Sequence, residues 1–135
     1  MSVRYPYLDH PGPKAFAHRG GSKEVPENTV EAFEHAVSLG YRYLETDVHA
    51  TVDGELFAFH DDVLDRVTDH VGTVASRTAA ELRRVRIGGT DPIPFAADLW
   101  AAWCADRPDF WGPIADAALE AYRLHAEALD AAAKN

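Results

Sequence analysis

The chain has 135 residues, of which 47% are hydrophobic, so its length suits a single domain and its composition argues against disorder. Its formal net charge of −9 argues against broad electrostatic binding to nucleic acid or an anionic membrane, and leaves any recognition of an anion to a local site. Cys104 is the only cysteine, which excludes a disulfide within the chain and favours a cytoplasmic location, and we expect neither a signal peptide nor a transmembrane segment.

The first predicted element is a short buried strand. Residues 14–21 read KAFAHRGG, an apolar run that breaks into a glycine-rich loop. His18 and Arg19 therefore stand at the carboxyl end of this strand. Because the carboxyl ends of the strands form the ligand face of parallel α/β sheets and barrels, both side chains are candidates for a functional site.

A helix is predicted next, over the sequence PENTVEAFEHAVSLGY at residues 26–41. Asn28 with Glu31 three residues later gives the pattern of an N-cap, and Gly40 gives that of a terminator. Apolar residues recur at helical spacing, at Val30, Phe33 and Val37. A strand over residues 41–49 follows, so the chain begins with a strand, helix, strand unit whose connection suits a parallel pair.

Two acidic residues occupy this second strand, where acids are usually depleted. Side chains alternate between the two faces of a strand, so Glu45 and Asp47 share a face. Two negative charges roughly 6.6 Å apart repel by ~2.5 kcal/mol at an effective dielectric of about 20, and a cation between them reverses that sign. The two carboxylates are therefore candidate ligands of a metal ion.

A hairpin is predicted around Asp53 and Gly54, a dipeptide that is the strongest short signal for such a turn. The strand that leaves the turn ends at His60. A two-residue turn places Asp47 directly opposite His60 on one face of the hairpin, so that a carboxylate meets an imidazole. The alternative is a solvated hairpin whose polar face contacts only water.

The segment after the hairpin contains a second helix signal. Thr78 with Glu81 three residues later forms a capping box, which predicts a short helix through Arg86, closed by Gly88 and Gly89. The alternation of strands and helices up to this point indicates an α/β fold.

The candidate site residues share one location in the predicted fold. Each stands at the carboxyl end of a predicted strand, at His18, Arg19, Glu45, Asp47 and His60. Two hard carboxylates suit Mg²⁺ or Ca²⁺, an arginine offers a planar fork to phosphate oxygens, and two histidines can act as general acid and base near neutral pH. Zinc is the weaker alternative, because the spacing supplies neither cysteines nor a compact histidine pair. The residue types are those needed to cleave a phosphodiester.

The sequence resembles the glycerophosphodiester phosphodiesterase family over about residues 15–94. The segments AHRGG, PENTVEAFEHAVSLG, LETDVHATVDGELFAFHDD and IP (Ile93 and Pro94) look like the successive landmarks of that family, in order and at the usual intervals. The resemblance implies that this part of the chain builds the first strands of a TIM barrel.

The resemblance also implies roles for individual residues. It implies that His18 and His60 are an acid/base pair and that Arg19 is a phosphate ligand. It also implies that Glu45 and Asp47 are ligands of a divalent ion, Mg²⁺ or Ca²⁺. Glu27, in the segment PENT, is expected to line the substrate site. A role at the start of the helix, favoured by the helix dipole, is an equal alternative for this residue.

The sequence departs from the family in its last third. A TIM barrel typically needs about 250 residues, and the family's later glutamate followed two positions on by lysine does not occur after Ile93. From about Ala96 the composition shifts, since alanine makes up 14 of the last 40 residues against 9 of the first 95. Residues 96–108 and 113–135 predict two helices. We therefore expect a partial barrel over residues 1–95 and a helical tail over residues 96–135.

The predicted function is metal-dependent hydrolysis of glycerophosphodiesters to glycerol 3-phosphate and an alcohol. The alternative is a catalytically incompetent, truncated remnant that keeps a rim able to bind phosphate and metal. The expected partner is a small phosphodiester and not a nucleic acid. Because a partial barrel exposes the edges of its strands, we also expect a chain that self-associates or is marginally stable.

Overall fold

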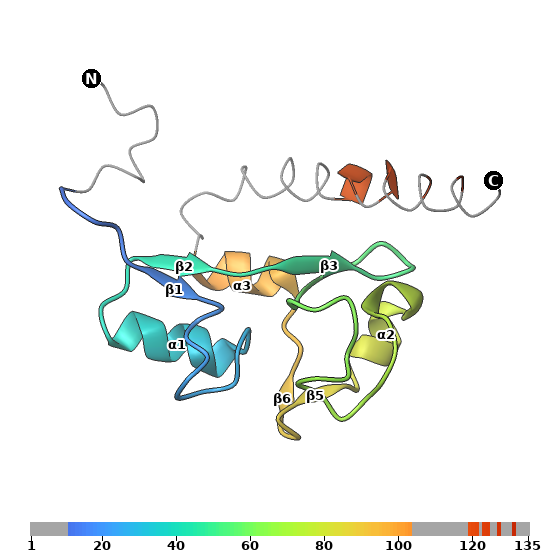
Figure 1. The fold of residues 1–135 in the computed structure, drawn as a ribbon, viewed down its shortest axis with the longest axis horizontal. Helices are drawn as coiled ribbons and strands as arrows, with labels where there is room; N and C mark the ends of the chain where they lie inside the picture. The colour runs from blue at the N-terminus through green and yellow to red at the C-terminus, as the bar shows by residue number, and fades with distance from the viewer. Residues whose placement is uncertain (1–10, 104–118, 122, 125–126, 128–130, 132–135) are drawn as a thin grey trace.

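The computed structural model describes residues 11–103 and, in the tail, residues 119–121, 123–124, 127 and 131. They form a mixed α/β arrangement, as the sequence predicts (Figure 1). The strands make three separate two-stranded sheets, and within these residues they do not close into a barrel. The elements in chain order are β1 (Phe16–His18), α1 (Val30–Ser38), β2 (Tyr43–Glu45), β3 (Val48–Ala50), β4 (Leu56–Ala58), the 3-10 helix η2 (Val74–Ser76), α2 (Ala79–Leu82), β5 (Arg86–Ile87), β6 (Asp91–Pro92) and α3 (Ala96–Trp103).

The strand, helix, strand unit at the start of the chain is confirmed. β1 and β2 pair in parallel, with Phe16 beside Tyr43 and His18 beside Glu45. The aromatic rings of Phe16 and Tyr43 stack with their centroids 5.0 Å apart, and α1 lies beneath both strands (Figure 1). This register brings His18 and Glu45 together at the carboxyl ends of the two strands.

Helix α1 begins one residue later than the sequence pattern predicts. The N-cap is Thr29, whose hydroxyl accepts a hydrogen bond from the backbone N–H of Ala32 at 3.1 Å. Asn28, the predicted cap, is buried in a left-handed conformation with φ of 55°, and its side chain accepts a hydrogen bond from Thr46 at 2.7 Å. The contact with Thr46 takes the asparagine away from the helix end, which leaves the cap to the threonine.

The end of α1 follows the prediction, but its buried face does not. Gly40 has φ of 89° and donates to the carbonyl of Val37, while Tyr41 donates to that of Ala36, which is the hydrogen-bond pattern of a Schellman motif. The buried face consists of Ala32, Phe33 and Ala36. Of the three apolar residues predicted at helical spacing, Phe33 is buried, whereas Val30 and Val37 are exposed. Small alanines let the helix lie close to the strands.

The hairpin register differs from the prediction by one residue. β3 and β4 are antiparallel, with Val48 opposite Ala58, and the loop spans three residues between Thr51 and Glu55. Asp47 therefore lies opposite Phe59, whose backbone N–H donates to the Asp47 carbonyl at 3.0 Å, and not opposite His60. The predicted two-residue turn was wrong.

Contacts outside the hairpin account for the longer loop. The carboxylate of Asp53 accepts a hydrogen bond from the backbone N–H of Ala79 at 2.9 Å, and Val52 donates to the carbonyl of Arg77 at 2.9 Å. The hydroxyl of Thr51 accepts from the backbone of Glu55 and closes the loop. The turn is thus fixed by the segment that leads into α2.

The capping box of α2 is confirmed, but the helix is shorter than predicted. Thr78 and Glu81 exchange side-chain and backbone hydrogen bonds, and the helix ends at Leu82 rather than Arg86. The backbone of Arg86 instead pairs with Asp69, whose carboxylate accepts from its N–H at 2.9 Å. Arg86 and Ile87 form β5, which pairs with β6, so Gly88 and Gly89 lie in the connection between two strands and do not close a helix as predicted.

The hydrophobic core has two parts. The larger is made by Phe57, Phe59, Leu64, Val74, Ala79, Leu82, Val85, Ile87 and Ile93. In the smaller, Leu99 of α3 packs against Phe33 of α1 and Ala58 of β4. α3 confirms the start of the first predicted tail helix, and most of the second lies outside the described residues. No helix among the described residues is both long and apolar enough to cross a membrane.

Candidate active site

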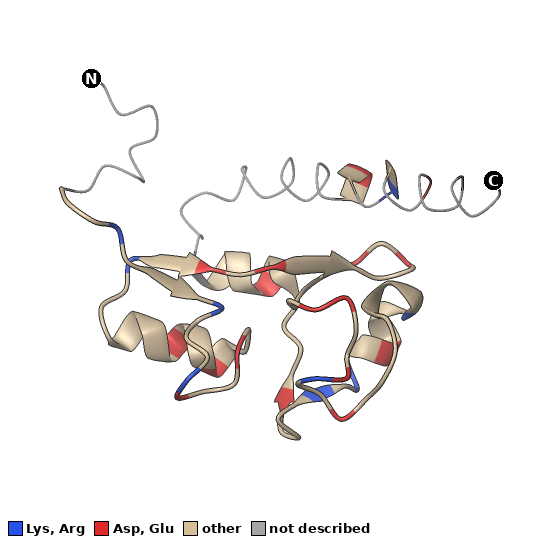
Figure 2. Ribbon diagram, viewed as in Figure 1, with Lys and Arg blue, Asp and Glu red and all other residues tan. Residues whose placement is uncertain are grey.

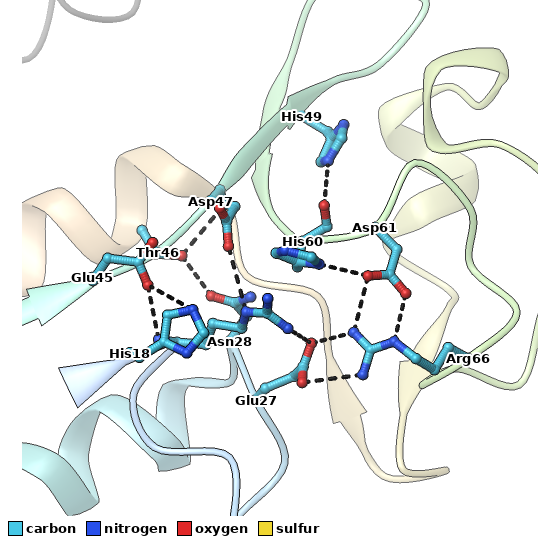
Figure 3. Close-up of polar contacts among 11 residues, drawn as sticks. His18, Glu27, Asn28, Glu45, Thr46, Asp47, His49, His60, Asp61 and Arg66 are labelled. Carbon is cyan, nitrogen blue, oxygen red and sulfur yellow. Dashed lines mark hydrogen bonds and ion pairs between the residues drawn. The ribbon is translucent and has the colours of Figure 1, made fainter.

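The candidate site lies where β1 and β2 end and where the chain leaves β4 (Figure 3). The carboxylate of Glu45, the last residue of β2, accepts a hydrogen bond from the backbone N–H of Arg19 at 3.1 Å. The same oxygen is 3.9 Å from Nε2 of His18, whose side chain is 67% exposed. Figure 2 shows acidic residues gathered at the junction of β2 and β3, beside this edge.

Arg19 adopts a left-handed backbone conformation with φ of 54°, which is unusual for a residue with a Cβ atom. Its carbonyl accepts a hydrogen bond from the backbone of Asn28 at 2.9 Å, which holds the loop between them. The guanidinium is largely buried and donates from Nη1 to Glu27 at 3.1 Å. Strain of this kind is maintained only where the surroundings fix the residue, and it is common at functional sites.

Asp47 carries a buried oxygen that lacks a hydrogen bond. Its Oδ2 has no hydrogen-bond partner among the described residues, and neither has Nε of Arg19, which lies 3.8 Å away. A buried carboxylate oxygen without a hydrogen bond is costly, the Arg19 guanidinium offsets part of its charge as an ion pair, and a hard cation beside it would offset more. Carboxylates are ligands that a divalent ion takes, but no group of three or more potential ligands occurs among the described residues, so the metal site at Glu45 and Asp47 stays a prediction.

Glu27 lies between two arginines. Its carboxylate accepts one hydrogen bond from Arg19, at 3.1 Å, and two from Arg66, at 2.6 and 3.2 Å. The side chain is only 11% exposed. These hydrogen bonds, chiefly those from Arg66, hold the pKa of Glu27 below its ordinary value and outweigh the opposing effect of burial. Glu27 thus lines the candidate site, and its carboxylate is engaged by arginines.

His60 is hydrogen-bonded to its neighbour Asp61, with 2.6 Å between Nδ1 and Oδ1. Arg66 donates to both oxygens of Asp61, at 2.6 and 3.0 Å, and this holds the pKa of that carboxyl far below its ordinary value, with a smaller effect from His60. An ionised carboxylate can only accept hydrogen bonds, so Nδ1 of His60 carries the proton. Nε2 is left for a substrate.

The backbone of His60 is also held in place. His49 donates from Nε2 to the His60 carbonyl at 2.9 Å, and its other ring nitrogen lies 3.9 Å from Asp62. The sequence motifs assign no role to His49. In the structure it supports the segment that carries His60 (Figure 3).

The structure brings all six predicted site residues into one chain of contacts. It runs from His18 through Glu45, Arg19, Glu27, Arg66 and Asp61 to His60, and Asp47 joins it at Arg19. Sequence reasoning missed Arg66 and the role of Asn28. Arg66 stands in the charged stretch DDVLDRVTD, which is typical of a solvated loop, and its partner Glu27 is 39 residues away.

A model of the glycerophosphoryl diester phosphodiesterase family matches residues 18–114. The match contains every predicted site residue and reaches beyond residue 94, where the resemblance in the motifs ends.

Individual relatives match a shorter part of the chain. The glycerophosphodiester phosphodiesterase of Caldanaerobacter subterraneus subsp. tengcongensis is 46% identical over 72 residues, which are 53% of this chain and 30% of that protein. The one of Bacillus altitudinis is 48% identical over 71 residues, which are 53% and 29% of the two chains. The matched part of the chain thus spans less than a third of the length of these relatives.

The chain is also similar to solved structures of phosphodiesterases. A glycerophosphodiester phosphodiesterase from Agrobacterium tumefaciens superposes with a TM-score of 0.63 at 30% identity, over 64% of this chain and 41% of that one. A phosphodiesterase from Oleispira antarctica, solved in complex with the product sn-glycerol-3-phosphate, gives a TM-score of 0.59 at 35% identity, over 62% and 37%. Since the family model covers well over half of the sequence, the chain belongs to the glycerophosphoryl diester phosphodiesterase family.

Proposed function

We propose that this chain hydrolyses a glycerophosphodiester to glycerol 3-phosphate and an alcohol with the help of a divalent cation. The observation that carries the proposal is the chain of contacts that joins the two histidines, His18 and His60, through a partly buried arginine and a set of carboxylates. The names of the relatives and the product bound to the Oleispira antarctica structure support the choice of substrate.

His18 and His60 are the proposed acid/base pair. In the hydrolysis, a water oxygen bonds to phosphorus and the bond from phosphorus to the alcohol oxygen breaks. One histidine takes the proton from the water and the other gives a proton to the departing alcohol. The proton on Nδ1 of His60 is bound to Asp61, so Nε2 is the atom that exchanges a proton with the substrate.

Arg19 is the proposed ligand of the phosphate. Glu27 accepts a hydrogen bond from only one of its terminal nitrogens, Nη1, so the planar fork keeps donors for phosphate oxygens. The shared carboxylate of Glu27 orients the guanidinium toward the strand ends. Glu27 itself lines the substrate site in this proposal.

Glu45 and Asp47 are the residues that would hold the cation, Mg²⁺ or Ca²⁺. When bound, such an ion supplies positive charge that offsets the charge on the phosphate oxygens. The buried Oδ2 of Asp47, which has no hydrogen-bond partner among the described residues, supports this assignment. Two carboxylates leave most of the coordination sphere to water and substrate, so the chain alone binds the ion weakly.

The second candidate function is a rim that binds phosphate and metal without turnover. It is favoured by the number of ligands, since residues 11–103 and the described tail residues contain no group of three or more side chains able to hold a metal ion. A rim of this kind still binds glycerol 3-phosphate, but it releases no product from a diester.

We further propose that β1 and β2 are the first two strands of a barrel and that residues 96–135 form a tail. The parallel pairing of β1 with β2 supports the assignment of these strands.

We also propose that the chain is cytoplasmic, which the single cysteine supports, and that it self-associates. Within the described residues β1 pairs only with β2, so no described strand occupies its other edge, and an unpaired edge favours association. Light scattering across a dilution series tests association, and a constant monomer mass contradicts it.

The function is tested by release of glycerol 3-phosphate from glycerophosphocholine, measured across pH with and without a chelator. We expect a bell-shaped profile near neutral pH, loss of activity with the chelator, and a decrease of roughly 10²- to 10⁴-fold in His18→Ala and in His60→Ala. His70→Ala is the matched control, because His70 bonds to Asp69 outside the site. Equal rates in wild type and His60→Ala would assign the activity to another source.

A further inference from the structure

We propose that Arg66 is a positioning residue, whose guanidinium fixes the carboxylate of Asp61 against His60 and so determines which nitrogen of that imidazole carries the proton. The proposal rests on the acid/base role of His60. It concerns a residue that lies outside the strand ends and that reaches His60 through Asp61.

The contact between Arg66 and Asp61 is two-pronged. Nε of Arg66 donates to Oδ2 at 2.6 Å, and Nη2 donates to Oδ1 at 3.0 Å. The same Oδ1 accepts the proton of His60 Nδ1 at 2.6 Å. Because both oxygens are held, the carboxylate cannot rotate away from the imidazole without breaking one of the prongs.

The adjoining edge of the guanidinium, which shares Nη2 with the first, is anchored to a distant segment. Nη1 and Nη2 donate to the two oxygens of Glu27 at 3.2 and 2.6 Å, across 39 residues of chain (Figure 3). Arg66 therefore spans two carboxylates, one beside Arg19 and one beside His60. A lysine ammonium is a point charge on a flexible stem and cannot present two such edges at once.

The remaining freedom of His60 lies in its ring. Its backbone carbonyl is held by His49 at 2.9 Å, so Asp61 is the contact that sets the orientation of the imidazole. With Asp61 fixed, Nδ1 keeps its proton and Nε2 is available to the substrate. Without Arg66 the carboxylate is free to turn toward solvent, and the imidazole samples both tautomers.

The ion pairs of Arg66 with Glu27 and Asp61 are too exposed to contribute much to the stability of the fold. The side chain of Arg66 is 47% exposed, and ion pairs in contact with water add little to folding. Substitution of Arg66 is therefore expected to leave the chain folded while it alters His60. This separates a positioning role from a purely structural one.

The direct test is the tautomer of His60, read from the ¹⁵N shifts of its ring nitrogens in the full chain, at a pH above which those shifts no longer change. His60→Gln identifies the signals. In the wild type we expect a protonated Nδ1 and an unprotonated Nε2, and in Arg66→Lys and Arg66→Gln a mixture of both forms. Arg84→Lys, an exposed arginine outside this network, is the control and keeps the wild-type shifts.

Three outcomes overturn the proposal: a proton on Nε2 in the wild type, an unchanged tautomer in a folded Arg66→Lys variant, or the same shift in the control. The wild-type measurement stands even where a variant fails to fold, which circular dichroism detects. In the turnover assay we expect kcat of Arg66→Lys to fall roughly 10- to 100-fold with KM changed by less than about threefold. Absence of turnover in the wild type contradicts the proposed function alone, and the tautomer then decides the role of Arg66.

Discussion

Arg66 donates to both carboxylate oxygens of Glu27, at 2.6 and 3.2 Å, although the two residues are 39 positions apart in the chain. The contact joins the loop that precedes α1 to the loop that follows β4. Arg19, the proposed phosphate ligand, also donates to Glu27, so one carboxylate binds both Arg19 and Arg66. Arg66 in turn contacts Asp61, which is bound to His60. The site is therefore assembled by a contact between loops as well as by the ends of the strands.

The ionised form of Glu27 stabilises the fold. We expect Glu27→Gln to lower the free energy of unfolding at neutral pH by less than about 1 kcal/mol, because the amide keeps one acceptor oxygen and the bonds that it loses are to Arg66, whose side chain is half exposed. The folded-state pKa lies below the ordinary value of 4.5, so this contribution is complete well above that pH and is lost as the pH falls from there through the folded-state pKa.

Urea unfolding of both proteins from neutral pH to below pH 4.5 measures the effect. The gap in unfolding free energy between wild type and variant should narrow on acidification. The other carboxyl groups are common to the two proteins, so they cancel in the comparison. A gap that stays constant, or widens, in acid contradicts the assigned role of Glu27.

Binding of a divalent ion should depend on Asp47. Calorimetric titration with Mg²⁺ and with Ca²⁺ is expected to give a dissociation constant of about 10⁻³ M, because only two protein carboxylates are available. Asp47→Asn keeps the size of the side chain but removes the charge, and should weaken binding at least about tenfold. Asp62→Asn is the control, since that side chain is 94% exposed. Identical heats in Asp47→Asn and wild type refute the assignment.

Gly20 is predicted to be needed for the close approach of the loop after β1 to α1. A Cβ atom at this position lies 2.8 Å from the Cβ of Ala32 and 2.9 Å from its backbone carbon, and φ is 78°. Gly20→Ala should lose about 2–4 kcal/mol of stability, from backbone strain and overpacking together. At Gly21, φ is 99° but a Cβ atom meets nothing within 4 Å, so Gly21→Ala should lose only about 1–2 kcal/mol. Equal losses in denaturant titrations argue against the contact.

The sequence was sufficient for the features that depend on local pattern. The parallel pairing of β1 with β2, the end of α1 at Gly40 and the capping box at Thr78 all follow from short-range signals, and the structure contains them. The strand ends that carry His18 and Glu45 were located for the same reason. Local rules suffice where the deciding contacts lie within a few residues.

The errors arose where distant contacts decide. The predicted hairpin register was wrong by one residue, because the carboxylate of Asp53 accepts a hydrogen bond from the backbone of Ala79 and no local turn rule includes this contact. The helix cap shifted to Thr29 because Asn28 is held by Thr46. Arg66 was missed for the same reason, since its partner Glu27 comes from another loop.

We propose that the ends of β1 and β2 together with His60 form one site for a phosphate monoester or diester. Titration of the ¹⁵N-labelled chain with sn-glycerol 3-phosphate and Mg²⁺, followed residue by residue, tests it without requiring turnover. We predict saturable shifts that concentrate at Arg19, Asp47 and His60 and that disappear in Arg19→Ala. The hollow of about 290 Å³ lined by Leu39 and Tyr41 should be unaffected. Shifts confined to that hollow, or no saturable shift at the strand ends, would contradict the account.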